Sequence, residues 1–292
     1  MASAFYDHPS QKMKVVAVTG TRGKSTTTYL IHHCLETAFK KHGSGIRVFL
    51  GGNVRGVSTL PLMAEVRLGD IVVLELDSWQ LQGFGDLHIS PNIAVFTNLM
   101  PDHQNYYPDM DSYFSDKANI FRYQKEGDSL FVGEKIADRV IAEHPPVPAA
   151  VPPSLPSQWA LKIPGAHNRE NASLAAAAAS ALGLSEDAIR EGVESFEGVE
   201  GRLQFMREVC GVRIYNDNNA TTPEATLAAL KALDAGNKNI VLIMGGADKN
   251  LDMSALLYEV AKTCKRVLLL SGTGTSRIVP LMSDYSVYDD ID

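Results

Sequence analysis

The chain has 292 residues, of which 45% are hydrophobic and 21% are charged, the composition of a globular protein with room for about two domains. Thirty-four acidic and 27 basic residues give a net charge of −7. The basic residues do not gather into a run that could follow a phosphate backbone, so we expect no nucleic-acid partner. A chain of this length buries enough surface to fold without disulfides.

The cysteines and the apolar stretches indicate where the protein works. Cys34, Cys210 and Cys264 are far apart in the sequence and form no C-x-x-C pair, which is typical of a reducing compartment. The most apolar stretch, 172–182, is shorter than the roughly 20 residues that span a bilayer. The N-terminus lacks the basic and apolar regions of a signal peptide. We therefore expect a cytoplasmic protein without membrane association.

From residue 14 onward, short runs rich in β-branched residues alternate with longer segments of helical periodicity. This alternation predicts an α/β fold with a mostly parallel sheet covered by helices. The expected strands are 14–19, 46–50, 70–76, 92–97 and 129–132, and the expected helices are 24–41, 58–66 and 111–123. Six prolines in 144–156 exclude a helix or a central strand there, so we expect a surface loop or an irregular edge.

The second half of the chain predicts a smaller α/β unit. Helices at 168–182 and 186–196 are expected to close the first domain. The later elements are a hairpin of 203–209 and 212–216, helices at 223–233 and 253–264, and strands at 239–244 and 266–270. We therefore expect an N-terminal extension (1–13), a larger domain (14–200) and a smaller Rossmann-like α/β domain (201–292).

The first expected strand runs into a glycine-rich loop and then into a helix, which is the context of a phosphate-binding loop. The loop consists of Gly20, Thr21, Arg22, Gly23, Lys24, Ser25 and Thr26. Lys24 would reach the β- and γ-phosphates of ATP, and the Ser25 hydroxyl would hold Mg²⁺. The common pattern has its first glycine where this chain has Val18. We interpret 14–200 as a P-loop type ATPase domain, and a glycine-rich turn without a ligand is the alternative.

Polar residues follow two other expected strands. Glu75 lies near the end of an apolar strand, at the edge where doubly wound sheets bind ligands. Its carboxylate, the Ser25 hydroxyl and phosphate oxygens would suffice for Mg²⁺. His103 follows the next strand, and Lys117 lies between apolar neighbours on an expected helix. Taken alone, these two would be a loop histidine and a solvated lysine.

Several motifs together make the chain resemble the Mur ligase family, and within it the ligases that add D-glutamate to UDP-N-acetylmuramoyl-L-alanine in peptidoglycan synthesis. The matching segments are 20–26, 51–53, 75–81, 98–103, 117–121, 165–172, 201–203, 215–217, 220–221 and 245–249. They follow one another in the family's order. From the resemblance we expect the chain to lack the family's N-terminal uridine-nucleotide domain and its extreme C-terminus.

The resemblance implies how the chain would hold ATP. The loop 20–26 would bind the phosphates, with Lys24 neutralising charge on the transferred group. Three residues outside the loop would complete the nucleotide site: Asn171 near the adenine, Arg202 near the phosphates and Asp217 at the ribose.

The resemblance also implies a catalytic site with two Mg²⁺ ions. Ser25 and Glu75 would hold one of them. His103 would help to hold the second, together with Lys117 after CO₂ has converted its amine into a carbamate. This conversion would turn a cation into a carboxylate-like metal ligand.

The implied substrates are small molecules. Asn53 would lie near UDP-N-acetylmuramoyl-L-alanine, and Lys249 would lie toward the incoming D-glutamate. Because a carboxylate is a poor electrophile, ATP would first convert it to an acyl phosphate, from which the amine of the amino acid displaces phosphate. This route needs no covalent enzyme nucleophile. We expect the protein to act as a monomer.

Four residues depart from the family's pattern, one of them by the milder change of serine to Asn218. Asp77 stands where the family has serine, Gly201 where it has histidine, and Asn219 where it has lysine. Because Asn219 removes a cation near the expected phosphates, two alternatives stay open. One is another amide ligase of the Mur or folylpolyglutamate type, and the other is a non-catalytic ATP-binding fragment. Segments 23–26 and 246–249 favour the D-glutamate ligases, because relatives more often carry other residues there.

Overall fold

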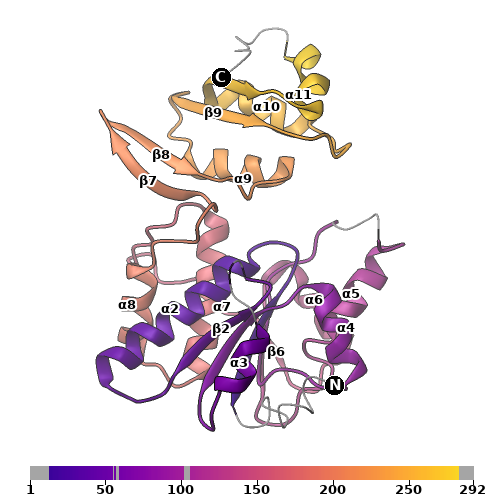
Figure 1. Cartoon of the computed structure of the whole chain (residues 1–292), viewed down its shortest axis with the longest axis vertical. Coiled ribbons are helices and arrows are strands. Elements are labelled where there is room, and N and C mark those ends of the chain that lie inside the picture. Colours follow the sequence, from indigo (N-terminus) through magenta and orange to yellow (C-terminus); the bar gives the residue numbers. More distant parts are fainter. Residues whose placement is uncertain (1–12, 55, 57–58, 102–105, 283–292) are drawn as a thin grey trace. The chain divides into compact units, whose positions relative to one another are not determined.

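The computed structural model describes residues 13–54, 56, 59–101 and 106–282, and the chain divides into two compact units. The first unit contains the residues up to Lys162 together with His167–Gly198. The second unit contains Ile163–Ala166 and the residues from Val199 onward. Each unit has its own parallel sheet (Figure 1), which confirms the predicted α/β class.

The first unit is built on a six-stranded parallel sheet. Its strands lie in the order β2 (Val48–Gly52), β3 (Ile71–Glu75), β1 (Lys14–Thr19), β4 (Ile93–Phe96), β5 (Ser129–Val132) and β6 (Ala149–Ala150). Neighbouring strands are parallel throughout, so their carboxyl ends meet at one edge. β3 and β4 are buried along their whole length, and β1 is buried after its first residue. Burial on both faces explains their continuous apolar sequences.

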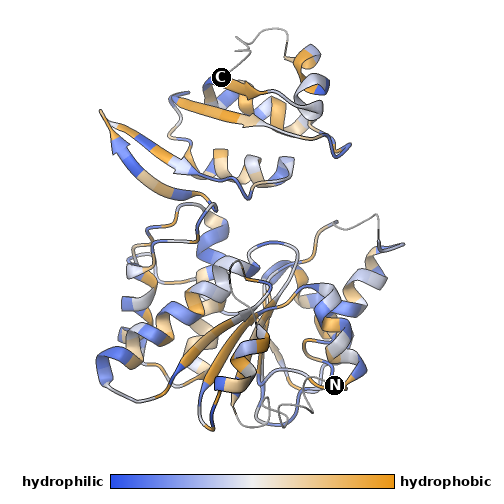
Figure 2. Ribbon diagram, in the orientation of Figure 1, coloured by the Kyte–Doolittle hydropathy of each residue, from blue (hydrophilic) through white to orange (hydrophobic). Residues whose placement is uncertain are grey.

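Helices cover both faces of this sheet (Figure 1). On one face, α4 (Ser78–Asp86), α5 (Met110–Ala118) and α6 (Glu134–Ala142) share a core with the strands. On the other face, α2 (Lys24–His42) contacts β1, β2 and β3, and α8 (Glu186–Ser195) packs against α2. α7 (Ala166–Ala181) lies with them, and α3 (Thr59–Glu65) packs beside β2. The strands are the most continuously hydrophobic part of this unit (Figure 2).

The second unit combines a hairpin with a two-stranded parallel sheet. β7 (Gln204–Val209) and β8 (Val212–Asn216) form the predicted antiparallel hairpin. β9 (Ile240–Gly245) pairs in parallel with β10 (Cys264–Leu270). The core of the unit comes from β10 and from α9 (Pro223–Leu233), α10 (Ser254–Thr263) and α11 (Thr273–Ile278). A 3₁₀ turn, Val279–Leu281, follows α11.

The strands lie close to their predicted positions, whereas the sequence does not predict α4, α6 and α11. α5 ends at Ala118, because residues 119–123 form turns instead of continuing the predicted helix. The proline-rich segment contributes only β6, a two-residue strand at the edge of the sheet. No helix among the described residues is long and apolar enough to cross a membrane.

α2 and α8 are in close contact at Gly192. A Cβ on Gly192 would lie 2.7 Å from Cys34 Sγ and 2.8 Å from Cys34 Cα, and Cys34 is fully buried. We predict that Gly192→Ala lowers the free energy of unfolding by about 1–3 kcal/mol, because the added methyl group has to displace helix backbone in a packed core. Urea denaturation measures this loss.

Gly83→Ala in α4 is the matched control. A Cβ there would meet no atom within 4 Å, so the change adds helix propensity without a clash. We expect this variant to unfold at the wild-type urea midpoint or above it. Equal midpoints for the two alanine variants would contradict the packing argument.

Candidate functional site

The loop between β1 and α2 forms a compact turn at the carboxyl edge of the sheet. Gly20 and Gly23 have φ angles of +138° and +81°, which residues with side chains rarely adopt. A Cβ on Gly20 would lie 2.0 Å from Thr97 Oγ1, and one on Gly23 would lie 2.2 Å from Asn171 Oδ1. Only glycine fits at both positions. The loop therefore keeps its backbone close to its neighbours at the N-terminus of α2, and helix N-termini in general are suited to binding anions.

The end of β4 holds this loop in place. Thr97 Oγ1 and Asn98 Nδ2 both donate to Arg22 O, at 2.6 and 3.1 Å. Arg22 N donates to Asn98 Oδ1 (2.9 Å), and Thr21 N donates to Asn98 O (2.9 Å). The sequence analysis gives Thr97 and Asn98 no role of their own. The sequence gives one indication of their role: both residues directly follow an apolar strand, where parallel sheets place ligand-binding residues.

Two lysines from different helices converge on one carbonyl oxygen of the loop. Lys24 Nζ, on α2, donates to Gly20 O at 3.0 Å. Lys117 Nζ, on α5, donates to the same oxygen at 3.1 Å and to Thr19 Oγ1 at 3.4 Å. Lys117 is only 1% exposed, and its Nζ lies 4.8 Å from the centre of the Tyr113 ring. The solvated lysine that the sequence left as an alternative is therefore excluded.

A carboxylate and a hydroxyl are buried at the same edge. Glu75 is the last residue of β3 and is 3% exposed, and Ser25 in the first turn of α2 is 7% exposed. Asn53 follows β2, and its N–H donates to Glu75 O at 2.7 Å. Carboxylate and hydroxyl oxygens are ligands that suit Mg²⁺.

A metal ion beside Ser25 and Glu75 would need further ligands from a bound substrate. Within residues 13–54, 56, 59–101 and 106–282, no group of three or more His, Cys, Asp and Glu side chains could hold a metal ion. Ser25 and Glu75 therefore fit a cation whose other ligands are water and phosphate oxygens, the usual arrangement for Mg²⁺. His103, the other predicted ligand, lies outside the described residues.

In the second unit, Asp217 fixes the turn after β8. Its Oδ1 accepts a hydrogen bond from Leu203 N at 2.8 Å. Burial raises the pKa of Asp217, and this rise is only partly opposed by the Leu203 hydrogen bond and the charge of Arg202. Arg202 is exposed, and its N–H donates to Val199 O at 3.1 Å.

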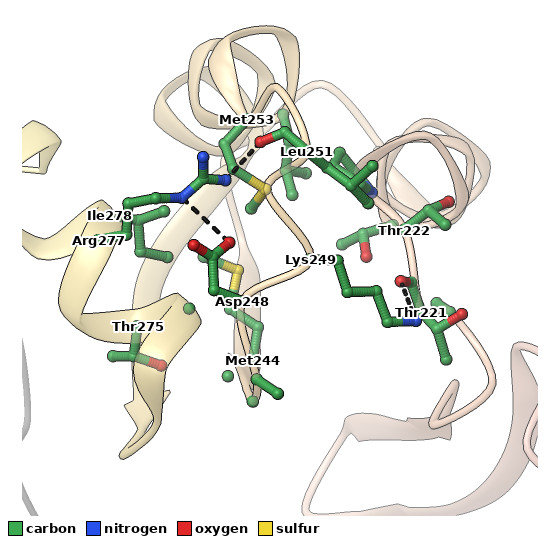
Figure 3. A pocket seen from close by; sticks show the side chains of 18 of the residues that line it. Thr221, Thr222, Met244, Asp248, Lys249, Leu251, Met253, Thr275, Arg277 and Ile278 are labelled. Atoms are coloured by element: carbon green, nitrogen blue, oxygen red, sulfur yellow. Dashed lines mark hydrogen bonds and ion pairs between the residues drawn. The ribbon is translucent and has the colours of Figure 1, made fainter. Parts of the chain in front are cut away.

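A pocket of about 310 Å³ lies at the carboxyl end of β9, lined by the first residues of α9 and α11 (Figure 3). Lys249 Nζ donates to Thr221 O at 3.3 Å. Arg277 pairs with Asp248 (Nε to Oδ1, 3.2 Å) and also donates to Leu251 O. The sequence analysis selects Lys249 but misses Arg277, which lies outside the recognised motifs. The pocket thus offers Lys249 to an anionic ligand, together with Arg277, whose charge is partly neutralised by Asp248.

The residues that depart from the family's pattern have local structural roles. Asp77 is the N-cap of α4, where its side chain accepts from Gln80 N at 2.8 Å. Gly201 has a φ of +70°, and a Cβ there would lie 2.1 Å from Asn218 Oδ1 and 2.6 Å from Asn219 Nδ2. A side chain at position 201 therefore does not fit beside these two asparagines. Gly201 and Asn219, two of the residues that depart from the family's pattern, therefore pack against each other.

Two family models match this chain. The Mur ligase middle domain matches residues 18–151, and the Mur ligase, glutamate ligase domain matches residues 201–286. The two matches lie in the first and second unit respectively. The P-loop and the two-lysine site thus fall in the first match, and the pocket of Lys249 in the second.

Curated relatives match nearly the whole chain. A UDP-N-acetylmuramoylalanine–D-glutamate ligase from Roseiflexus sp. (strain RS-1) is 36% identical over 90% of the chain and 62% of its own length. The ligase of that name from Acetivibrio thermocellus is 35% identical over 89% of the chain and 58% of its own length. The chain therefore spans about three fifths of the length of these relatives.

Solved structures share the fold. MurF from Acinetobacter baumannii superposes with a TM-score of 0.72 and 18% identity, over 99% of this chain and 70% of that one. Folylpolyglutamate synthase from Mycobacterium tuberculosis, complexed with ADP and AMPPCP, gives a TM-score of 0.68 and 17% identity, over 92% and 77% of the two chains. At these identities the likeness establishes the α/β fold.

We predict that Asp217→Asn removes a pH dependence from the stability of the second unit. Because the folded pKa is raised, the stabilisation from Asp217 is fully present below its ordinary value of 3.8 and is lost as the pH rises through the folded pKa. Asparagine still accepts the Leu203 hydrogen bond and carries no charge. Relative to wild type, the variant should therefore gain stability as the pH rises through this range.

Two measurements check this prediction. NMR titration of the Asp217 carboxyl carbon gives its folded pKa, and urea unfolding of both proteins across that range gives the stability difference. A wild-type Asp217 that titrates at or below 3.8 would contradict the expected raised pKa.

Proposed function

Because this chain belongs to the Mur ligase family, we propose that it adds D-glutamate to UDP-N-acetylmuramoyl-L-alanine at the expense of ATP, in peptidoglycan precursor synthesis. The observation that carries the proposal is the convergence of Lys24 and Lys117 on Gly20 O. It brings two lysine side chains together beside a glycine-rich loop, one to bind phosphate and one to become a metal ligand, at the edge that also holds the buried Glu75. Such a site suits the transfer of a phosphoryl group.

The loop fits the phosphates of ATP. Gly20 and Gly23 let the backbone approach an anion, and the N-terminus of α2 adds partial positive charge. Lys24 Nζ would exchange its Gly20 carbonyl contact for the β- and γ-phosphate oxygens. Asn171 lies against Gly23 and would contact the adenine. Arg202 would contact the phosphates, and Asp217 would contact the ribose.

Ser25 and Glu75 would hold one Mg²⁺, and His103 with carbamylated Lys117 would hold a second. When bound, these ions neutralise charge on the transferred phosphoryl group. An amine attacks CO₂ only in its neutral form, and exclusion from water disfavours the ammonium form. The burial of Lys117 therefore supports a carbamate at this position.

The reaction proceeds in two displacements. A carboxylate oxygen of the sugar substrate attacks the γ-phosphorus, the bond to the β–γ bridging oxygen breaks, and ADP leaves. The amine of D-glutamate then attacks the acyl carbon of the acyl phosphate, forms a tetrahedral intermediate and expels phosphate. Lys24 stabilises the phosphoryl group and Asn53 orients the sugar substrate, while Lys249 binds the glutamate in the pocket that it shares with Arg277.

The direct test is turnover by the purified chain with ATP, Mg²⁺, UDP-N-acetylmuramoyl-L-alanine and D-glutamate. We expect ADP, phosphate and the D-glutamyl product in equal amounts. Product formation with another acceptor in place of D-glutamate would instead indicate a different amide ligase. ATP binding without phosphate release in the presence of any acceptor would indicate a non-catalytic protein.

We predict that Lys117→Ala lowers kcat by at least about 100-fold, because it removes the carbamate from the metal site. Lys125→Ala, at an exposed lysine a few residues further along, is the matched control and should turn over like wild type. Added formate should partly restore activity to Lys117→Ala, because its carboxylate can replace the carbamate as a ligand. Unchanged turnover in Lys117→Ala would refute the metal-ligand role.

We predict that Gly23→Ala weakens ATP binding at least about tenfold, because its Cβ would collide with Asn171 and distort the loop. Gly43→Ala is the matched control, since Gly43 has a φ of +60° at the other end of α2 and meets no atom within 4 Å. It should lose stability but keep its ATP affinity. Calorimetric titration with ATP compares them, and similar affinities would count against the loop's role.

A further inference from the structure

An exposed aromatic pair lies near the phosphate loop. Trp79 is in the first turn of α4, shortly after β3, and Tyr106 lies before α5. They are 40% and 53% exposed, and their ring centroids are 5.4 Å apart at an interplanar angle of 72°. Adjacent exposed aromatic rings are typical of a binding surface, because water solvates them poorly. We call Trp79 and Tyr106 the aromatic shelf.

Neighbouring side chains hold the shelf in position. Tyr106 contacts Tyr107 edge to face at 4.8 Å, and Gln82 Nε2 lies 3.5 Å from Tyr106 Oη. Tyr107 Oη and Gln82 Nε2 both donate to Asp116 Oδ2, at 2.8 and 2.7 Å. Burial raises the pKa of Tyr107, so its hydroxyl keeps the donated proton. A shelf that is ordered before binding loses little entropy when a ligand covers it.

Ring contacts connect the shelf to the two-lysine site. Tyr107 contacts Tyr113 at 5.0 Å, and the Lys117 Nζ lies 4.8 Å from the centre of the Tyr113 ring. Tyr113 Oη also lies 3.5 Å from Thr21 Oγ1 in the phosphate loop. A substrate that reacts beside Lys117 can therefore place its more distant part on the shelf.

The adenine of ATP is not the expected occupant. Asn171, proposed to contact the adenine, belongs to α7. The shelf belongs to α4 and to the segment before α5, and these helices cover the other face of the sheet (Figure 1). The two sides of the loop thus serve different ligands, and the shelf is left for the substrate that accepts the phosphoryl group.

The sugar substrate matches the shelf in size and chemistry. Its reacting carboxylate is separated from its pyranose ring by an alanyl and a lactyl unit, which together span about 7 Å when extended. The pyranose ring can therefore contact a surface beside the reacting site, such as the one that Tyr107 and Tyr113 connect to it. A pyranose ring presents a face of C–H bonds, and the negative face of an aromatic ring is complementary to it.

We propose that the aromatic shelf binds the pyranose ring of the N-acetylmuramoyl substrate and so positions its carboxylate for phosphorylation. This inference rests on the proposed function and deepens it by assigning the sugar contact to Trp79 and Tyr106. Both residues touch the substrate at a distance from the reacting atoms. Their loss should therefore weaken binding of one substrate rather than slow the chemical steps directly.

The first test uses the two tryptophans of the chain, Trp79 and Trp159. Trp159 is only 5% exposed and serves as the internal reference. In the ¹⁵N-labelled protein, Trp79→Phe assigns the two indole N–H signals. N-acetylmuramoyl-L-alanine at millimolar concentration, without any nucleotide, should shift the Trp79 signal and leave the Trp159 signal in place. An unmoved Trp79 signal would overturn the inference.

The second test is kinetic. Trp79→Ala should raise the KM for UDP-N-acetylmuramoyl-L-alanine about tenfold and leave the KM for ATP unchanged. Trp79→Phe should keep most of the affinity because it retains a ring. Tyr258→Ala, at a 74% exposed tyrosine of the second unit, is the control and should behave like wild type. A rise in the KM for ATP alone would instead place the adenine on the shelf.

The two tests separate the shelf from the ligase activity. If no acceptor yields product, the proposed function fails, while the indole signals still decide whether the shelf binds the sugar. If product forms and neither the Trp79 signal nor the KM of Trp79→Ala changes, the ligase proposal stands and the shelf inference fails.

Discussion

The carbonyl oxygen of Gly20 accepts hydrogen bonds from Lys24 and Lys117, and much of the first unit is arranged around this shared contact. Two ammonium groups held this close repel each other, and anions relieve the repulsion, either phosphate oxygens beside Lys24 or the carbamate proposed for Lys117. Three further features order this edge of the sheet before such anions bind. They are the glycines of the loop, the hydrogen bonds from Thr97 and Asn98, and the burial of Glu75. The packing of the first unit therefore supports the proposed phosphate site.

The sequence predicts the loop because its signal is local: strand, glycines, lysine and helix follow one another directly. It predicts the parallel sheet for the same reason, since each buried strand is a continuous apolar run. It does not predict α4, because the glycines at 83 and 85 disfavour a helix. Gly85 is needed for packing instead, since a Cβ there would lie 2.6 Å from Asn119 Nδ2. The burial of Lys117 depends on how α5 meets β1, which local sequence cannot specify.

The two units carry different parts of the proposed chemistry. The first holds the groups that handle phosphate and the aromatic shelf, whereas the second holds a pocket with Lys249 and Arg277. The departures at Gly201 and Asn219 belong to the second unit, where they pack together. Reverting one of them alone would place a larger side chain against its unchanged neighbour, so these positions are structurally coupled.

The edge strand β6 has a consequence for solubility. It pairs with β5 on one side, and it is the last strand of the sheet. Pro148 precedes it and Pro152 follows shortly after, and proline has no N–H to offer a further strand. An open parallel sheet is a template for intermolecular pairing, which is how many proteins begin to aggregate. The flanking prolines thus keep this edge strand short, which leaves few backbone groups for pairing with other copies of the chain.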